Sequence, residues 1–425
     1  MRPNIVLLHG HDFGRWLPAY GMPSVPAPAL TRFAHDSTVF DAAHATAPLC
    51  TPARGSLFTG LSPHRHGLLG LTHHGWRYRP GVTTLPELLR PLGYRTALVG
   101  LQHEDHDPTV LGFDEVHGLG FLPRALPVAD EAVRWLRGRP GEPFLLTVGM
   151  WEAHRPWPAE DYRHADPERV DVPGYLPDNA HTRADIAAFH GALRQLDEAM
   201  GRVLAAVDRY TDPANTMVIV TTDHGAAFPG AKGTLYEPGT GVALMIRPPR
   251  SWRGAPSRYP GLVSHLDIAP TLLAAAGAAP PDELEGESLL PALTGAPPTD
   301  RLLVTQKTFH DGYDPIRAVR DGRHAYIRNI EPGPRLRLSR DLAESQTRLG
   351  MGDDHLAPRP AEELYDLAAD PWERVNLAED PGHAEVRAAL SAHLDEWMRA
   401  TGDPLRHGVV PEPAPAVRQG APGAE

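Results

Sequence analysis

Cysteine is almost absent from this sequence, because the 425 residues include only one, Cys50. A single cysteine excludes an intramolecular disulfide framework, so packing alone must hold the fold together. Apolar runs are also short, and none approaches the roughly 20 residues that a helix needs to cross a membrane. The first apolar run ends by His9, which is too short for a secretory signal, and we therefore expect a cytoplasmic protein.

Positive charge is in short supply as well. The chain has 41 Lys and Arg residues against 53 Asp and Glu residues, and its formal net charge is -12. This balance argues against nucleic acid or an anionic membrane as the main partner, although local cations can still bind a small anion. Hydrophobic residues make up 41% and charged residues 22%, which is typical of a globular protein.

Short apolar runs, each bounded by polar residues or glycine, are typical of buried parallel strands. They cover 5–8, 96–99, 144–148, 217–221 and 242–246. Helical patterns lie between them at 84–92, 129–136 and 183–207. This alternation predicts an α/β fold, with a doubly wound, mostly parallel sheet flanked by helices.

The pattern changes near residue 295. Strand-like runs at 302–306, 316–319 and 324–327 precede a helical stretch at 384–400. The length of the chain also favours more than one domain. We therefore expect a large α/β domain over 1–295 and a smaller C-terminal α+β domain over 296–405, followed by a disordered tail over 406–425.

Polar side chains follow four of the expected strands. They are His11, Asp12, His103, His154, Asp223 and His224. In doubly wound folds, ligands bind beyond the carboxyl ends of the strands. We therefore expect these imidazoles and carboxylates to converge on one site.

The most specific pattern is Cys50-Thr51-Pro52-Ala53-Arg54, followed by Gly-Ser-Leu-Phe-Thr-Gly. Pro52 suits the first turn of a helix, which places Cys50 at the amino-terminal end, where backbone N–H groups favour an anion. Arg54 lies one turn along, and its guanidinium can reach the same anion. The alternative is a buried structural cysteine beside a surface arginine.

This segment resembles the sulfatase signature Cys-x-Pro-x-Arg, in which a formylglycine-generating enzyme oxidises the cysteine to formylglycine. The resemblance implies a metal-dependent hydrolase of the alkaline-phosphatase superfamily whose nucleophile is made from Cys50. It also implies that the modifying enzyme is a partner in maturation. Arg54 would then stabilise charge on the sulfate.

Two further segments resemble the metal-binding motifs of the same family. Asp223-His224 has histidine where most sulfatases have asparagine, and His11-Asp12 has histidine where they have a first aspartate. The resemblance implies a metal site made of His11, Asp12, Cys50, Asp223 and His224. An oxygen-rich shell favours Ca²⁺, which we expect, while two imidazoles would also tolerate Mn²⁺ or Zn²⁺. A strand-end cap is the alternative for Asp223-His224, and a bond to a carbonyl for His11.

The resemblance also implies three catalytic side chains. Lys232 lies nine positions after Asp223, where sulfatases place a cation on the sulfate. His154 matches a His-x-Pro segment and would give a proton to the leaving group, while His103 would deprotonate the formylglycine hydrate. Leu101 stands where the family has a lysine, so one sulfate cation is missing. Structural or surface roles are the alternatives for all three.

The segments 223–239 and 314–320 look most like the heparan N-sulfatase (sulfamidase) branch of the family. On this basis His310, Tyr313 and Arg317 would border the substrate, with packing or surface roles as the alternative. We expect a small sulfated substrate, carrying a sulfate ester or an N-sulfate. A phosphonate or phosphate ester hydrolase of the same superfamily is the second hypothesis, and a non-catalytic sulfated-glycan binder the third.

Overall fold

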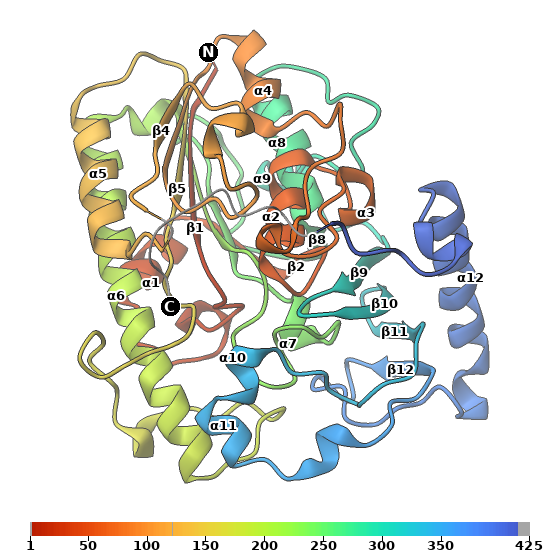
Figure 1. Cartoon of the computed structure of the whole chain (residues 1–425). Helices are drawn as coiled ribbons and strands as arrows, with labels where there is room; N and C mark the ends of the chain where they lie inside the picture. Colours follow the sequence, from red (N-terminus) through yellow and green to blue (C-terminus); the bar gives the residue numbers. More distant parts are fainter. Residues whose placement is uncertain (1, 121, 415–425) are drawn as a thin grey trace.

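The computed structural model describes residues 2–120 and 122–414. Its centre is an eight-stranded sheet with the order β4-β3-β5-β1-β6-β7-β2-β8 (Figure 1). The strands are β1 (Asn4–Gly10), β2 (Thr38–His44), β3 (Arg95–Gly100), β4 (Glu115–His117), β5 (Phe144–Gly149), β6 (Thr216–Thr222), β7 (Leu244–Arg247) and β8 (Arg258–Ser264). The predicted α/β class with a mostly parallel sheet is confirmed.

One strand runs against the others. β7 pairs antiparallel with both β6 and β2, whereas the remaining pairs of this sheet are parallel. The expectation of a parallel strand at 242–246 is therefore wrong. The connection from β6 to β7 contains only the one-turn helix α7 (Glu237–Thr240), whereas parallel neighbours are usually joined by a full crossover helix.

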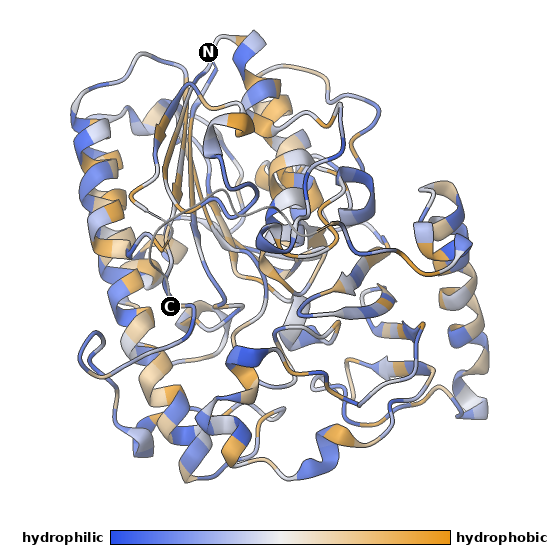
Figure 2. Cartoon of the chain, viewed as in Figure 1, coloured by the Kyte–Doolittle hydropathy of each residue, from blue (hydrophilic) through white to orange (hydrophobic). Residues whose placement is uncertain are grey.

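Helices cover both faces of this sheet (Figure 1). One face carries α1 (Pro28–His35), α5 (Ala125–Arg137) and α6 (Ala180–Tyr210), and the other carries α2 (Cys50–Thr59), α4 (Leu85–Leu89), α8 (Ile268–Ala275) and α9 (Leu290–Leu293). Side chains along β1 alternate between the two cores, with Val6 and Leu8 on one face and Ile5 and Leu7 on the other. Figure 2 shows this apolar interior in orange.

A second sheet is antiparallel, has four strands and lies beside the first (Figure 1). Its strands are β9 (Leu303–Phe309), β10 (Tyr313–Arg320), β11 (His324–Asn329) and β12 (Glu362–Asp366), and α12 (Ala384–Ala400) packs against it. This confirms the smaller C-terminal α+β unit. The short helices α3 (Pro63–His66), α10 (Arg340–Ala343) and α11 (Gln346–Leu349) complete the set.

The end of the chain is partly ordered within the described residues. A 3-10 turn covers Pro404–His407, and Val410 is buried against Phe309 and Leu68. The rest of the expected disordered tail, 415–425, lies outside the described residues. In 2–120 and 122–414, no helix is both long and apolar enough to cross a membrane.

Candidate active site at the carboxyl ends of the strands

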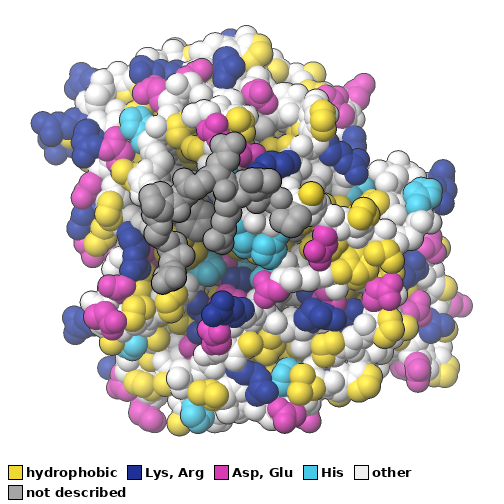
Figure 3. Space-filling model, in the orientation of Figure 1, with side chains coloured by type: hydrophobic (Ala, Val, Ile, Leu, Met, Phe, Trp, Pro, Cys, Tyr) yellow, Lys and Arg dark blue, Asp and Glu magenta, His cyan; other side chains and the backbone are white. Residues whose placement is uncertain are grey.

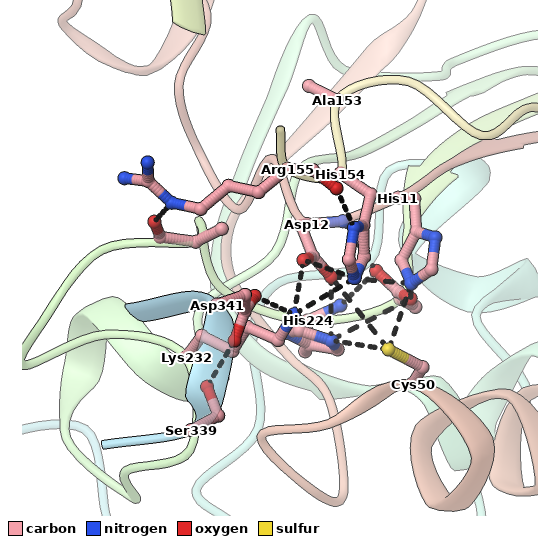
Figure 4. Close-up of polar contacts among 12 residues, drawn as sticks. His11, Asp12, Cys50, Ala153, His154, Arg155, His224, Lys232, Ser339 and Asp341 are labelled. Atoms are coloured by element: carbon pink, nitrogen blue, oxygen red, sulfur yellow. Dashed lines mark hydrogen bonds and ion pairs between the residues drawn. The ribbon is translucent and has the colours of Figure 1, made fainter. Parts of the chain in front are cut away.

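The predicted polar side chains meet because their strands are neighbours. β1 lies between β5 and β6, and β3 pairs with β5, so four parallel strands end along one edge of the sheet. His11 and Asp12 follow β1, and Asp223 and His224 follow β6. The ligand atoms of these four residues and of Cys50 all lie within 4.8 Å of one another. Figure 4 shows the side chains of His11, Asp12, His224 and Cys50 pointing toward one another.

Cys50 is the first residue of α2, as its motif predicts. Its side chain is buried, and Sγ lies 2.9 Å from Nε2 of His11 and 3.4 Å from Nε2 of His224. Burial and the charge of Asp12 raise the pKa of the Cys50 thiol above its ordinary value. The unmodified thiol is therefore protonated at neutral pH and is a weak nucleophile.

The two carboxylates alternate with the two imidazoles around the centre of the cluster. Oδ1 of Asp12 lies 3.0 Å from Nε2 of His224, and Oδ2 of Asp223 lies 3.2 Å from Nε2 of His11. Burial alone would raise the pKa of Asp12, but Lys232 and the neighbouring imidazoles outweigh it and hold that pKa well below its ordinary value. Both acids therefore stay ionised, since the pKa of Asp223 is lowered in the same way, mainly by His224 and Arg54 against its burial.

These residues fit a divalent cation. Two ionised carboxylates and two imidazoles, all fully buried, are the ligand types that proteins use for divalent metals. Nδ1 of His11 is buried and has no hydrogen-bond partner among the described residues. The polar contacts of this ring are therefore made by Nε2, which faces the centre of the cluster. A bound cation would offset the negative charge that Asp12 and Asp223 concentrate there.

Arg54 lies beside this cluster of candidate metal ligands, and it is not among the described residues that line the neighbouring cavity. Its side chain is fully buried, and Nη2 donates to Oδ2 of Asp223 at 3.0 Å and to the carbonyl of Gly10 at 3.1 Å. Nη1 donates a hydrogen bond to Nδ1 of His9, at 2.7 Å. The guanidinium therefore holds Asp223 in place. His9 was missed by the sequence reasoning, and its only signal is a polar residue inside an apolar strand.

Lys232 is the cation between the cluster and the cavity. Nζ lies 2.7 Å from Oδ2 of Asp12, 2.8 Å from Oδ2 of Asp341 and 3.3 Å from Nε2 of His154 (Figure 4). Burial would lower the pKa of Lys232, but Asp12 and Asp341 reverse this and raise it well above its ordinary value. Asp341, in α10, could not be identified from the sequence, because it lies among other polar residues and belongs to no recognisable sequence motif.

A buried ion pair positions the loop that carries His154. The guanidinium of Arg155 donates to both oxygens of Asp185 in α6, at 2.8 and 2.7 Å. Thr347 in α11 donates to the same carboxylate at 2.6 Å. α6 therefore ties down both the His154 loop and the C-terminal segment that brings Asp341 to the site.

A cavity of about 400 Å³ opens next to the cluster. Cys50, His103, His154, Lys232 and His310 are among the residues that line it. In Figure 3, histidine side chains gather near the middle of this face, beside charged residues of both signs. The cavity thus places a thiol, a cation and several imidazoles around one space large enough for a small ligand.

His103 lies in this wall between two other rings. Its imidazole is T-shaped to His11 and stacked on His73, with centroids 5.7 and 6.3 Å apart. Burial lowers the pKa of His103 to about 3, so the ring is neutral at neutral pH. The backbone carbonyl of His103 accepts a bond from the hydroxyl of Thr51, at 2.8 Å, which joins this loop to α2.

The three residues expected on the substrate side lie in different surroundings. His310 lines the cavity. Tyr313 packs against Phe309, with ring centroids 5.1 Å apart. Arg317 is fully buried and donates to both oxygens of Asp403, at 2.6 and 3.0 Å, which leaves it no surface for a substrate.

Leu101, which stands where a lysine was expected, is not among the described residues that line the cavity. Its side chain is buried, and its backbone N–H bonds to the carbonyl of Gly149 at 2.8 Å. Within the described residues that line the cavity, the cations are Lys232 and Arg340, and the acids are Asp311, Asp341 and Glu344. The cavity wall therefore carries no excess of positive charge.

Comparisons with known proteins agree with this arrangement. The family model described as Sulfatase matches residues 3–123 and 126–278. N-sulphoglucosamine sulphohydrolase from Homo sapiens is 29% identical, over 94% of this chain and 91% of that protein. N-acetylgalactosamine-6-sulfatase from Canis lupus familiaris is 31% identical, over 76% of this chain and 71% of the relative.

A solved structure with the same fold belongs to a different kind of hydrolase. The phosphonate monoester hydrolase of Agrobacterium radiobacter superposes with a TM-score of 0.73 at 21% identity, covering 94% of this chain and 96% of the other. At that identity the likeness shows the fold alone. The family model covers more than half of the chain, and the motif residues that it spans converge in one site. The chain therefore belongs to the sulfatase family, a family of sulfuric ester hydrolases.

Proposed function

We propose that this protein is a metal-dependent sulfatase that hydrolyses a sulfate ester or an N-sulfate of a sulfated sugar, through a formylglycine made from Cys50. The observation that carries the proposal is the convergence of the Cys50 side chain with two imidazoles and two carboxylates at the amino end of α2. The N-sulphoglucosamine relative supports a sulfated sugar as the substrate.

Conversion of Cys50 is required because the thiol is protonated and buried. Formylglycine at position 50 would supply, as its hydrate, a hydroxyl nucleophile, and a divalent metal held beside it would supply the positive charge that lowers the pKa of that hydroxyl. His11, Asp12, Asp223 and His224 would hold the metal. A formylglycine-generating enzyme is accordingly the partner that maturation needs.

The other residues bind the anion and move protons. Lys232 reaches the cavity and stabilises negative charge on the sulfate oxygens. Burial and Lys232 lower the pKa of His154, and an anion bound beside Lys232 opposes that shift. His154 then gives its proton to the leaving amine or alcohol. His103 would accept the proton of the second hydroxyl, so that the C–O bond to sulfate breaks, sulfate leaves and the aldehyde forms again.

Charge in the cavity favours a monoanion. A sulfate monoester carries one negative charge, and a phosphate monoester carries nearly two at neutral pH. Lys232 already pairs with Asp12 and Asp341, and Leu101 adds no cation. A second unpaired charge is costly to bury, so sulfate should be preferred to a phosphate dianion.

A phosphonate or phosphate ester hydrolase is the second candidate, and phosphonate monoesters and phosphate diesters are, like sulfate esters, monoanions. His224 and the missing lysine favour it, and the fold is shared with a phosphonate monoester hydrolase. A non-catalytic sulfated-glycan binder would need none of the proton-transfer groups. The two enzymatic candidates differ in the group that is hydrolysed, which is a sulfate in the first and a phosphonate or phosphate in the second.

Two measurements test the proposal. The intact mass of the peptide that contains Cys50, isolated from the native host, should show an aldehyde in place of the thiol. We also expect kcat/KM to be higher for aryl sulfate or N-sulfoglucosamine than for aryl phosphate or an aryl phosphonate monoester. A preference of more than about tenfold for the phosphonate, or 1.4 kcal/mol, would replace the first candidate by the second.

Cys50→Ala tests the assignment of Cys50 as the source of the nucleophile. We expect the variant to fold and to lose at least about 99.9% of turnover, because the nucleophile is removed. Cys50→Ser is the matched variant, because serine keeps a hydroxyl but carries no aldehyde hydrate. We expect it to lose turnover as well. Turnover by Cys50→Ala above a tenth of the wild-type rate would refute the assignment of the nucleophile.

A further inference from the structure

We propose that the metal of this site is a transition ion of the Mn²⁺ and Zn²⁺ class and not Ca²⁺, an inference that rests on the proposed function. The cluster presents two imidazole nitrogens where an oxygen-rich shell was expected. His11 and His224 both direct Nε2 at the inward oxygens of Asp12 and Asp223. Imidazole suits transition ions, whereas Ca²⁺ takes oxygen ligands.

The tautomer of His224 is suited to metal binding. Nδ1 lies 3.0 Å from the carbonyl of Gly225, and a carbonyl can only accept, so Nδ1 carries the proton of the neutral ring. The lone pair of the neutral ring is then on Nε2, which faces the cluster. Metal-binding histidines are commonly held in this way by a backbone carbonyl on the opposite nitrogen.

Each carboxylate offers only one oxygen to the centre. Oδ2 of Asp12 is taken by Lys232 at 2.7 Å. Oδ1 of Asp223 accepts the backbone N–H groups of Asp12 and His224, both at 2.9 Å. These bonds disfavour bidentate binding at both acids, and the inward Oδ2 of Asp223 also accepts a bond from Arg54, at 3.0 Å. The two acids therefore offer few oxygens to Ca²⁺, which takes about six to eight oxygen ligands.

The spacing of the inward atoms fits short bonds. The four nitrogen–oxygen distances are 3.0, 3.2, 3.4 and 3.8 Å. Ligands placed tetrahedrally at bonds of about 2.05 Å lie about 3.3 Å apart, which is the geometry of zinc with nitrogen and oxygen ligands. Ca²⁺ has bonds of about 2.3–2.6 Å and needs a wider, more populated shell.

The experiment measures binding without turnover. Cys50→Ser is used as the parent protein, because it removes the sulfur that would itself favour Zn²⁺. The stripped protein is titrated calorimetrically with ZnCl₂, MnCl₂ and CaCl₂. We expect Kd for Zn²⁺ or Mn²⁺ to be at least about 100-fold lower than Kd for Ca²⁺.

Exchange of the two imidazoles for oxygen ligands tests their role. His11→Asp with His224→Asn, in the same parent, should narrow the preference for Zn²⁺ over Ca²⁺ by at least about tenfold. His103→Asn is the matched control, because His103 also faces the cavity but lies outside the cluster, and it should leave the preference unchanged. An unchanged preference in the exchanged protein would refute the role of the imidazoles.

A spectroscopic measurement does not depend on the folding of the exchanged protein. Co²⁺ bound to the Cys50→Ser parent should absorb visible light strongly, as a site with four or five ligands does, and a weak octahedral spectrum would overturn the inference. Tighter binding of Ca²⁺ than of both Zn²⁺ and Mn²⁺ would also overturn it. Aryl sulfate turnover by the matured wild type is assayed separately, so failure of the metal class and failure of the proposed function are distinguishable.

Discussion

Arg54→Lys tests whether this arginine acts on the metal site or on the substrate. The wild-type guanidinium makes three bonds, to His9, to the carbonyl of Gly10 and to Asp223, at 2.7, 3.1 and 3.0 Å. Lysine keeps the positive charge but has one point of donation in place of a planar fork. We expect at least two of the three bonds to be lost.

The magnitude follows from the burial of the pair. Arg54 and Asp223 have no exposed side-chain surface. Disruption of a buried ion pair costs about 3–5 kcal/mol, and each hydrogen bond to a charged group contributes about 1.5–3 kcal/mol. Loss of two bonds therefore lowers the free energy of unfolding by about 3–5 kcal/mol. Since Asp223 loses its support, Kd for the metal should rise about 10- to 100-fold.

Arg317→Lys is the matched control for this change. Arg317 and Asp403 form a second ion pair with no exposed side-chain surface, held by two bonds at 2.6 and 3.0 Å. We expect a similar loss of stability and no change in metal affinity. Denaturant unfolding of the stripped proteins and calorimetric metal titration measure the two quantities. If Arg54→Lys keeps its metal affinity within about twofold and raises KM for aryl sulfate, Arg54 contacts the substrate and the reasoning is refuted.

Three further predictions concern charge, pH and metal. Asp341→Asn frees Lys232 from one carboxylate, so the ratio of kcat/KM for aryl phosphate to that for aryl sulfate should rise about 3- to 10-fold, and an unchanged ratio would contradict the charge argument. Burial raises the pKa of Glu104 to about 8 from 4.5, so the folded protein holds a proton that the unfolded chain releases, and stability falls as pH rises from 4.5 through 8. Glu104→Gln removes this pH-dependent loss of stability, which is at most about 4–5 kcal/mol. Tm measured from pH 5 to pH 9 should therefore fall less steeply in the variant than in the wild type, and equal slopes would refute the assigned protonation of Glu104. Exhaustive chelation should abolish aryl sulfate turnover, with recovery on addition of Mn²⁺ or Zn²⁺; full activity in metal-free protein, checked by elemental analysis, would rule out a metal-dependent reaction.

The local sequence determined most of the elements and the main candidates for the site. Short apolar runs predicted β1, β3, β5 and β6, and the segment from Cys50 predicted a helix that begins at the cysteine. These features depend on neighbours a few positions apart, and such patterns are legible in one sequence. β2 and β8 were not predicted, because charged residues, proline or glycine interrupt their apolar pattern.

Only the tertiary structure decided which side chains share the site and how they pair. Asp341 lies 109 positions from Lys232, and Arg54 lies 169 positions from Asp223, so no local pattern relates them. Arg317 looked like a substrate residue from its segment, yet packing buries it against Asp403. The sequence by itself determined the elements and the residue types at the strand ends. The packing of sheet and helices decided their contacts, because an unpaired buried charge is costly and each buried charged group therefore pairs with a residue that is near in space but distant in sequence.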